Sequence, residues 1–285
     1  MNNKTKAIIL IILSAFSFAL MSTFVKLSGN LPSFEKSFFR NLVSCIVAFY
    51  LIKKNSSPFF GKKENLKLLI LRSALGTVGI WASFYAIDNL ILSNANILNQ
   101  LSPFFVIIFS YIFLKEKIKP VHIISLCIAF LGMLFIIKPS FTMTETLFAS
   151  LIGLSSAVFA GGAYACVRAL GSREKSYTIV FFFSLFSIVT TIPFLLFDFK
   201  IPSITQVILL LLAGVFASIA QFALTLSYRY APAKEISIYT YTQVIFTAII
   251  GIIIWKEVPD TLSFIGYIVI IIASLNIFLY NKRQA

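Results

Sequence analysis

Apolar segments of about twenty residues recur along the whole chain, separated by short polar stretches. A bilayer's hydrocarbon core is about 30 Å thick and needs about 20 mainly apolar residues per helix. The pattern therefore predicts an all-α integral membrane protein rather than the alternating strands of a barrel. We expect ten transmembrane helices, at residues 7–27, 34–52, 66–88, 92–114, 120–137, 147–168, 177–197, 204–227, 234–255 and 261–280.

The composition agrees with a chain that faces lipid. Hydrophobic residues make up 59% of it and charged residues only 12%, whereas soluble domains have about 45–50% and about 25%. The net charge of +14 comes mostly from residues between the apolar segments. Basic residues placed in this way set membrane topology and do not form a nucleic-acid-binding face. We expect the lipid bilayer and a small-molecule substrate as partners, and no nucleic acid.

The basic residues also predict an orientation, because cytoplasmic loops are enriched in Lys and Arg. With the N-terminus inside, 18 of the 24 basic residues fall on the cytoplasmic side. The other six are Lys26, Lys36, Arg40, Lys138, Lys200 and Lys256. An even number of spans also keeps Lys282-Arg283 inside. We expect a multi-pass protein of the bacterial inner membrane with both termini cytoplasmic, whose first apolar segment is a retained span and not a cleaved signal peptide.

The two halves of the chain resemble each other. The pattern of residues 14–29 recurs at 156–171, and Lys115-Glu116 recurs as Lys256-Glu257, at offsets of 142 and 141 residues. We therefore divide the chain into a first five-helix repeat, 1–141, and a second, 142–285. Because five is an odd number, the second repeat is expected to be inverted. Inverted halves can exchange conformations around one site near the middle of the bilayer.

These residues resemble the drug/metabolite transporter superfamily and, within it, the EamA-type family of ten-helix transporters. The resemblance covers residues 7–280 and rests on the two Lys-Glu pairs, on Phe39-Arg40, on Leu101-Ser102-Pro103-Phe104 and on the stretch from Gly132 to Pro139. It implies a 5+5 inverted-repeat bundle whose cavity is lined mainly by helices 1, 3, 4, 6, 8 and 9. It also implies carriage of amino acids, nucleotide-related metabolites or other small solutes.

One departure from the family pattern concerns the helices expected to gate the site. The second repeat has Gln243 or Val244 where a proline would match Pro103. We therefore expect the fourth and ninth spans to differ in stiffness, with Pro103 as a gating break in the fourth.

The fourth span is the richest in polar residues. Asn96, Asn99 and Gln100 share one face at helical spacing, and Pro103 lacks the N–H that would bond the carbonyl of Asn99. A free carbonyl beside amides is suited to holding a ligand. Hydrogen bonding between helices explains the same residues without a ligand, and the sequence leaves both interpretations open.

Other spans contribute aromatic and amide side chains. The third span has Trp81 and Tyr85 one turn apart, and the sixth has Tyr164. Packing between helices is the alternative for these aromatic residues, and an interfacial position is the alternative for Tyr85. The full set of candidate substrate-binding residues is Trp81, Tyr85, Asn96, Asn99, Gln100, Tyr164, Gln221, Tyr239 and Gln243.

Chemistry other than binding finds little support. Charged residues cluster near span ends, and we expect Arg40 to form a structural pair with Glu35. The chain has one histidine, His122, and three cysteines within apolar segments. We therefore expect no catalytic residues, no metal, no cofactor and no disulfide.

The sequence thus predicts a secondary transporter, a facilitator or exchanger, working by alternating access as a monomer or homodimer. Amides and aromatic rings favour an amino acid or an amino-acid derivative as the solute. The alternatives are a receptor or scaffold without transport and a lipid-modifying membrane enzyme. Substrate counterflow in proteoliposomes discriminates between them. The solute, the direction and ion or proton coupling stay open.

Overall fold

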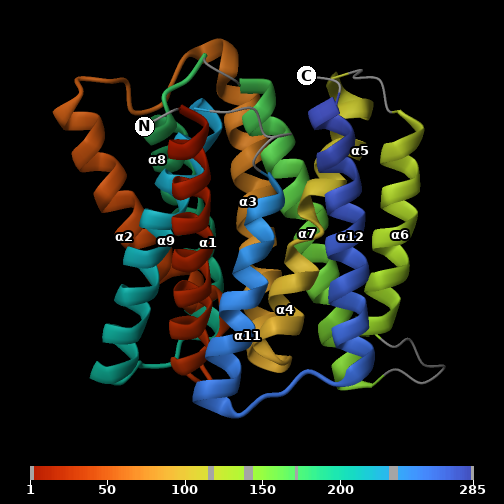
Figure 1. The fold of residues 1–285 in the computed structure, drawn as a ribbon. Helices are drawn as coiled ribbons and strands as arrows, with labels where there is room; N and C mark the ends of the chain where they lie inside the picture. Colours follow the sequence, from red (N-terminus) through yellow and green to blue (C-terminus); the bar gives the residue numbers. More distant parts are fainter. Residues whose placement is uncertain (1–2, 115–118, 138–143, 171–172, 231–236, 284–285) are drawn as a thin grey trace.

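The computed structural model describes residues 3–114, 119–137, 144–170, 173–230 and 237–283, and Figure 1 shows their arrangement. These residues form helices and connecting loops, with no strand among them. Lys115, Glu116, Lys138 and Gly171, which entered the predictions above, lie outside the described residues.

The first half contains six α-helices that make up five spans. They are α1 (Asn3–Leu27), α2 (Ser33–Lys54), α3 (Leu66–Asn89), α4 (Leu92–Asn99), α5 (Ser102–Leu114) and α6 (Pro120–Ile137), with the 3₁₀ turn η1 (Lys63–Asn65) before α3. The second half contains α7 (Glu145–Leu170), α8 (Ser176–Phe197), α9 (Ile204–Tyr230), the 3₁₀ segment η2 (Ser237–Tyr241), α11 (Thr242–Trp255) and α12 (Thr261–Arg283). The ten predicted spans are confirmed, and two of them are built from two pieces.

The two broken spans correspond to each other in the repeat. The fourth span is interrupted between α4 and α5, at Gln100 and Leu101, just before Pro103. The ninth changes from η2 to α11 at Tyr241, although no proline lies there. At this second break the Thr242 hydroxyl donates to the Tyr239 carbonyl at 2.6 Å. Such local bonds from a side chain to the backbone compete with the regular hydrogen bonds of a helix.

The two five-helix halves are inverted. Helix α1 starts at the end of the bundle where both termini lie, whereas α7 starts at the opposite end (Figure 1). Helices from different halves pack along each other in pairs: α1 with α9, α3 with α7, α2 with α8 and α6 with α12. We call the end opposite the termini the distal end; it holds residues 27–33, 89–92, 198–203 and 256–260.

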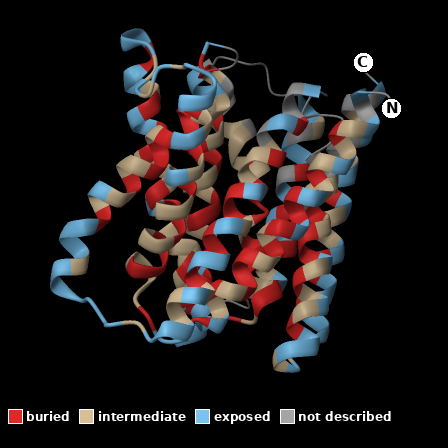
Figure 2. Cartoon of the chain, turned by 90° about the vertical axis from the view of Figure 1, so that its left-hand side faces the viewer, coloured by how far each residue is buried: buried red, intermediate tan, exposed pale blue. Residues whose placement is uncertain are grey.

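Many large hydrophobic side chains are exposed on the outer surface of the bundle. Figure 2 shows how the exposed and buried residues are distributed along the helices. Phe197 and Ile201 are 90% and 89% exposed, which suits contact with lipid rather than water. Six helical segments are long and apolar enough to cross a bilayer by length and composition alone. Helix α2 is not one of them; it carries Glu35, Lys36 and Arg40 near its start.

Small residues let the helices approach closely inside the bundle. Ala15 and Ala19 of α1 and Ala217 of α9 are almost fully buried. The Ser14 hydroxyl donates to the Ala220 carbonyl at 2.8 Å across the α1–α9 contact. A Cβ atom on Gly214 would lie 2.7 Å from the Val43 side chain, so glycine is needed where α9 crosses α2.

Candidate functional site

A chain of amide side chains links the fourth and ninth spans inside the bundle, and a serine of α1 joins it. Gln100 Nε2 donates to Gln243 Oε1 at 2.8 Å, and Gln243 Nε2 donates to Asn96 Oδ1 at 2.7 Å. The Ser22 hydroxyl of α1 also donates to Asn96 Oδ1, at 3.1 Å. All four residues are buried. The structure thus brings together three of the predicted residues, from the fourth and ninth spans.

The same contact joins the two helix breaks. The Tyr241 hydroxyl donates to the Gln100 carbonyl at 3.1 Å, and Gln100 Nε2 approaches the Thr240 carbonyl at 3.4 Å. The carbonyl contacted by a side chain of the other repeat is therefore that of Gln100, one residue after the Asn99 carbonyl singled out from the sequence. Because these groups satisfy one another, the breaks are held together in this conformation.

Three other predicted residues lie outside this amide chain. Asn99 Nδ2 donates to the Ser156 hydroxyl of α7 at 2.9 Å. Tyr239 packs against Ala7 and Ile11 of α1. Gln221 is half-buried on α9.

The predicted aromatic residues do not form one cage. The Trp81 ring lies edge-on to Phe34, with centroids 5.4 Å apart, and to Phe194, at 5.0 Å. Tyr85, one turn further, faces Phe148 at 6.1 Å. The indole N–H of Trp81 is buried without a hydrogen-bond partner. Trp81 therefore lies between α2, α3 and α8, in a different group from Tyr85.

Tyr164 lies beside two residues that sequence reasoning missed as site residues. Its phenol is within electrostatic reach of the guanidinium groups of Arg40 and Arg72. Both arginines are buried. Near the start of its span, Arg72 is among the 18 basic residues that the predicted topology places on the cytoplasmic side. An arginine within an apolar span was the available signal for both, since such residues are costly and usually functional.

The predicted pair between Arg40 and Glu35 is wrong. Arg40 Nη1 donates to Asn41 Oδ1 at 2.7 Å, while Glu35 Oε2 accepts from the backbone N–H of Lys200 at 3.2 Å. Residues five apart on a helix point in different directions, whereas three or four apart is the spacing that brings side chains together.

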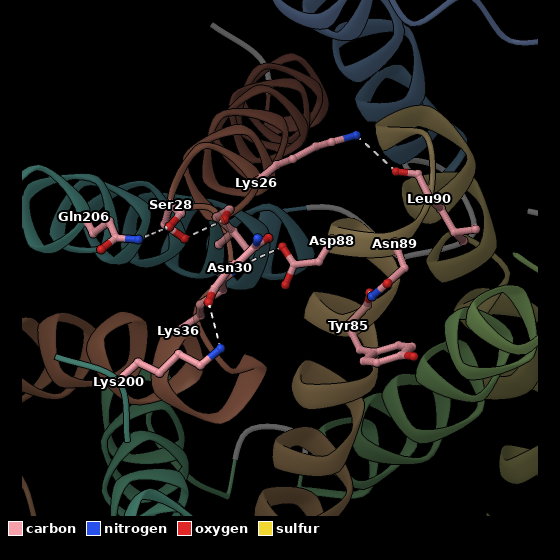
Figure 3. A network of polar contacts seen from close by, with 11 residues as sticks. Lys26, Ser28, Asn30, Lys36, Tyr85, Asp88, Asn89, Leu90, Lys200 and Gln206 are labelled. Atoms are coloured by element: carbon pink, nitrogen blue, oxygen red, sulfur yellow. Dashed lines mark hydrogen bonds and ion pairs between the residues drawn. The ribbon is translucent and has the colours of Figure 1, made fainter. Parts of the chain in front are cut away.

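Two ion pairs lie at the distal end of the bundle. Figure 3 shows Lys36 with Asp88 and the contact of Lys26 with Leu90. The Lys26 ammonium of α1 binds the Glu257 carboxylate and also donates to the Leu90 carbonyl at 3.1 Å. The other Glu257 oxygen accepts from the backbone N–H of Leu92 at 3.0 Å. Lys26, Leu90 and Leu92 belong to the first repeat and Glu257 to the second. These contacts therefore tie the two repeats together.

A second ion pair lies beside the first. The fully buried Lys36 of α2 binds Asp88 at the end of α3. Gln206 Nε2 of α9 donates to the Ser28 carbonyl at 2.8 Å, which adds another link between the repeats at this end. These contacts hold the helices together at the distal end.

The described residues hold no group of three His, Cys, Asp or Glu side chains arranged to bind a metal ion. The cysteines are free: Cys166 is buried, Cys45 is half-buried and Cys127 is exposed. Cys127 lies on the outer face of α6, although the sequence places it within an apolar segment.

The fold and its polar interior define a polytopic helical membrane protein made of two inverted repeats. The sequence matches the EamA-like transporter family at residues 5–138 and again at 147–279. The chain belongs to this family.

Relatives along nearly the full length are named as transporters. The pseudopaline exporter CntI of Pseudomonas aeruginosa is 34% identical over 270 residues, covering 94% of each chain. Human solute carrier family 35 member G1 is 27% identical, covering 87% of this chain and 72% of its own. One solved crystal structure superposes with a TM-score of 0.71 at 12% identity, covering 98% of this chain and 99% of that one, which supports the fold. The chain is a membrane transporter.

Proposed function

We propose that the protein is a secondary transporter, a facilitator or exchanger, for a small polar metabolite of the amino-acid class. It works by alternating access in the bacterial inner membrane, with both termini in the cytoplasm. The observation that carries this proposal is the contact between two interrupted helices, one from each inverted repeat. Transporters of this architecture bind solutes where discontinuous helices meet.

The polar contacts supply the elements that alternating access requires. The amide chain of Asn96, Gln100 and Gln243 connects the breaks, and the Lys26–Glu257 pair closes the distal end. Opening that end requires separating the ion pair, whereas closing the other end requires forming equivalent contacts there. A conformational change of this kind moves one repeat against the other around a fixed site.

The relative named as an exporter supports movement of a small molecule across the membrane. Amino-acid chemistry is supported by the amide and aromatic side chains inside the bundle. We infer that the protein performs no catalysis and uses no cofactor, in line with relatives named as transporters.

Substrate counterflow tests this function directly. Proteoliposomes loaded with an unlabelled amino acid or derivative are diluted into the same labelled solute. We expect transient accumulation of label that empty liposomes and a Gln100→Ala/Gln243→Ala variant do not show. Absence of counterflow for every member of a broad metabolite panel would favour the receptor or scaffold alternative.

A further inference from the structure

Buried polar side-chain atoms without hydrogen-bond partners gather on three helices. Among the described residues they all lie on α2, α3 and α8. They are Glu35 Oε1, Arg40 Nε, Arg72 Nε and Nη1, Thr77 Oγ1, Trp81 Nε1 and Ser184 Oγ. Native proteins leave few buried polar groups unpaired, and each such group asks for an explanation.

The two arginines of this set approach one aromatic ring. The Arg72 guanidinium carbon lies 3.7 Å from the centre of the Phe183 ring, and that of Arg40 lies 5.8 Å from it. The two guanidinium groups are therefore no further apart than the sum of these distances. Arg40 is 3% exposed and Arg72 is 5% exposed. Two positively charged side chains thus approach the same ring inside the bundle.

No carboxylate of the described residues neutralises them. The groups that interact electrostatically with Arg72 are Tyr164, Cys166 and Arg40, and for Arg40 the group is Tyr164. Burying a charge is costly unless a partner compensates. A ring face offsets only part of this cost. The arrangement lacks a negatively charged partner.

The unpaired atoms define what that partner must offer. Arginine can only donate hydrogen bonds, and Arg40 Nε, Arg72 Nε and Arg72 Nη1 are unpaired donors. Two guanidinium groups with unpaired donors match an oxyanion, which accepts charge-assisted hydrogen bonds.

The position of Arg72 is built into the packing. A Cβ atom on Gly76, one turn after Arg72, would lie 2.9 Å from the Phe183 ring and 3.3 Å from Arg72 Nη1. Glycine at this position lets the guanidinium and the ring share the space beside α3. A side chain held before its ligand arrives loses less entropy on binding.

We propose that Arg40 and Arg72, which lie on helices other than those of the amide chain, bind two carboxylate groups of the transported solute, which is therefore a small organic acid with net negative charge. This proposal rests on the transport function proposed above and narrows its substrate class to acidic amino acids and related dicarboxylic acids.

Ligand-induced stabilisation of the purified full-length protein in detergent tests the proposal. The probes are glutamate and the dicarboxylic acids from malonate to adipate; glutamine, succinamide and inorganic phosphate are controls. A ligand that binds the folded state raises the apparent Tm. We expect at least one organic acid to raise it and the uncharged analogues to leave it unchanged. Stabilisation by phosphate alone, or by none of the acids, overturns the proposal.

Arg40→Gln and Arg72→Gln assign the effect to the site, and Arg173→Gln, at an exposed position, is the matched control. We expect each buried substitution to weaken acid binding at least about tenfold and the control to leave it unchanged. Because an uncompensated buried charge is removed, the ligand-free variants are expected to be no less stable than the wild type. Variants that are less stable without ligand, yet bind acid as before, indicate a structural role and overturn the proposal.

Counterflow separates this proposal from the transport function. If acids bind in detergent but no counterflow occurs, the arginine site is supported and the transport function is contradicted. If an uncharged solute shows counterflow, and Arg40→Gln and Arg72→Gln do not change it, the transport function is supported and the arginine site is contradicted.

Discussion

Trp81 illustrates how a single side chain combines packing with an unused polar group. Its ring packs against Phe34 and Phe194, while its indole N–H has no partner. The sequence placed Trp81 on the right span but did not indicate which neighbours it has. Those neighbours depend on how α3 is rotated against α2 and α8, which side-chain spacing along one helix does not determine.

Trp81→Phe separates the two roles, because it keeps an aromatic ring and removes the N–H donor. We expect solute affinity in counterflow to fall about 2–10-fold, the worth of one neutral hydrogen bond. Thermal stability should stay within about 1 kcal/mol, since a buried unpaired donor disappears together with some ring contacts. Trp255→Phe is the control, because Phe keeps a ring beside Lys26. Unchanged affinity in Trp81→Phe would remove this N–H from the site.

The buried arginines show where reading residues one at a time failed. Arg40 and Arg72 each lie within the first eight residues of their helices, so both looked like charges at span ends. Helices α2 and α3 run in opposite directions, and both side chains reach the same ring of α8. That meeting point is a property of three packed helices and has no signature in any one segment.

At the scale of elements, the sequence predicted one of the two helix breaks. Pro103 identified the break between α4 and α5, because proline removes a backbone donor. The break between η2 and α11 has no proline, and the sequence therefore predicted a difference between the two spans. In the structure both spans are interrupted at corresponding positions, and tertiary contacts such as that of Tyr241 with Gln100 join them.

The ion pair between Lys26 and Glu257 is expected to control access at the distal end. In a cysteine-free background, a Thr23→Cys reporter on α1, which is buried one turn before Lys26, is labelled with a membrane-impermeant maleimide. Lys26→Met should increase the labelling severalfold, because the ion pair between the two repeats is lost. Lys53→Met, an exposed position at the other end, is the control.

Exchanging the two charges strengthens this test. The Lys26→Glu/Glu257→Lys variant should restore most of the protection, since attraction between the two positions is retained. Equal labelling in the wild type and Lys26→Met would show that other contacts close this end.

At the scale of the whole molecule, the spans were the most predictable feature. Bilayer thickness fixes helix length, and the predicted ends lie within a few residues of those observed. The inverted arrangement followed from an odd number of spans per repeat. Lys119 at the start of α6 lies 5.3 Å from the Tyr280 ring near the end of α12, so these two helix ends lie on the same side.

Accessibility mapping checks the orientation in the membrane. In a cysteine-free background, Lys119→Cys and Arg283→Cys should react with an impermeant reagent only after the cells are permeabilised. Lys200→Cys, at the distal end, should react in intact cells. All three positions are exposed. Labelling of positions 119 and 283 from opposite sides would contradict the inverted-repeat architecture.

The uncompensated pair of arginines also bears on the energetics of the transport cycle. An empty carrier has to change conformation with two bare positive charges inside it, whereas a carrier loaded with a dianion moves as an electrically neutral unit. Membrane voltage acts on a net charge with about 2.3 kcal/mol per 100 mV and leaves a neutral unit unaffected. For the proposed dianionic solute we therefore expect the return of the empty carrier to be the slow step and one-for-one exchange to be faster than net transport.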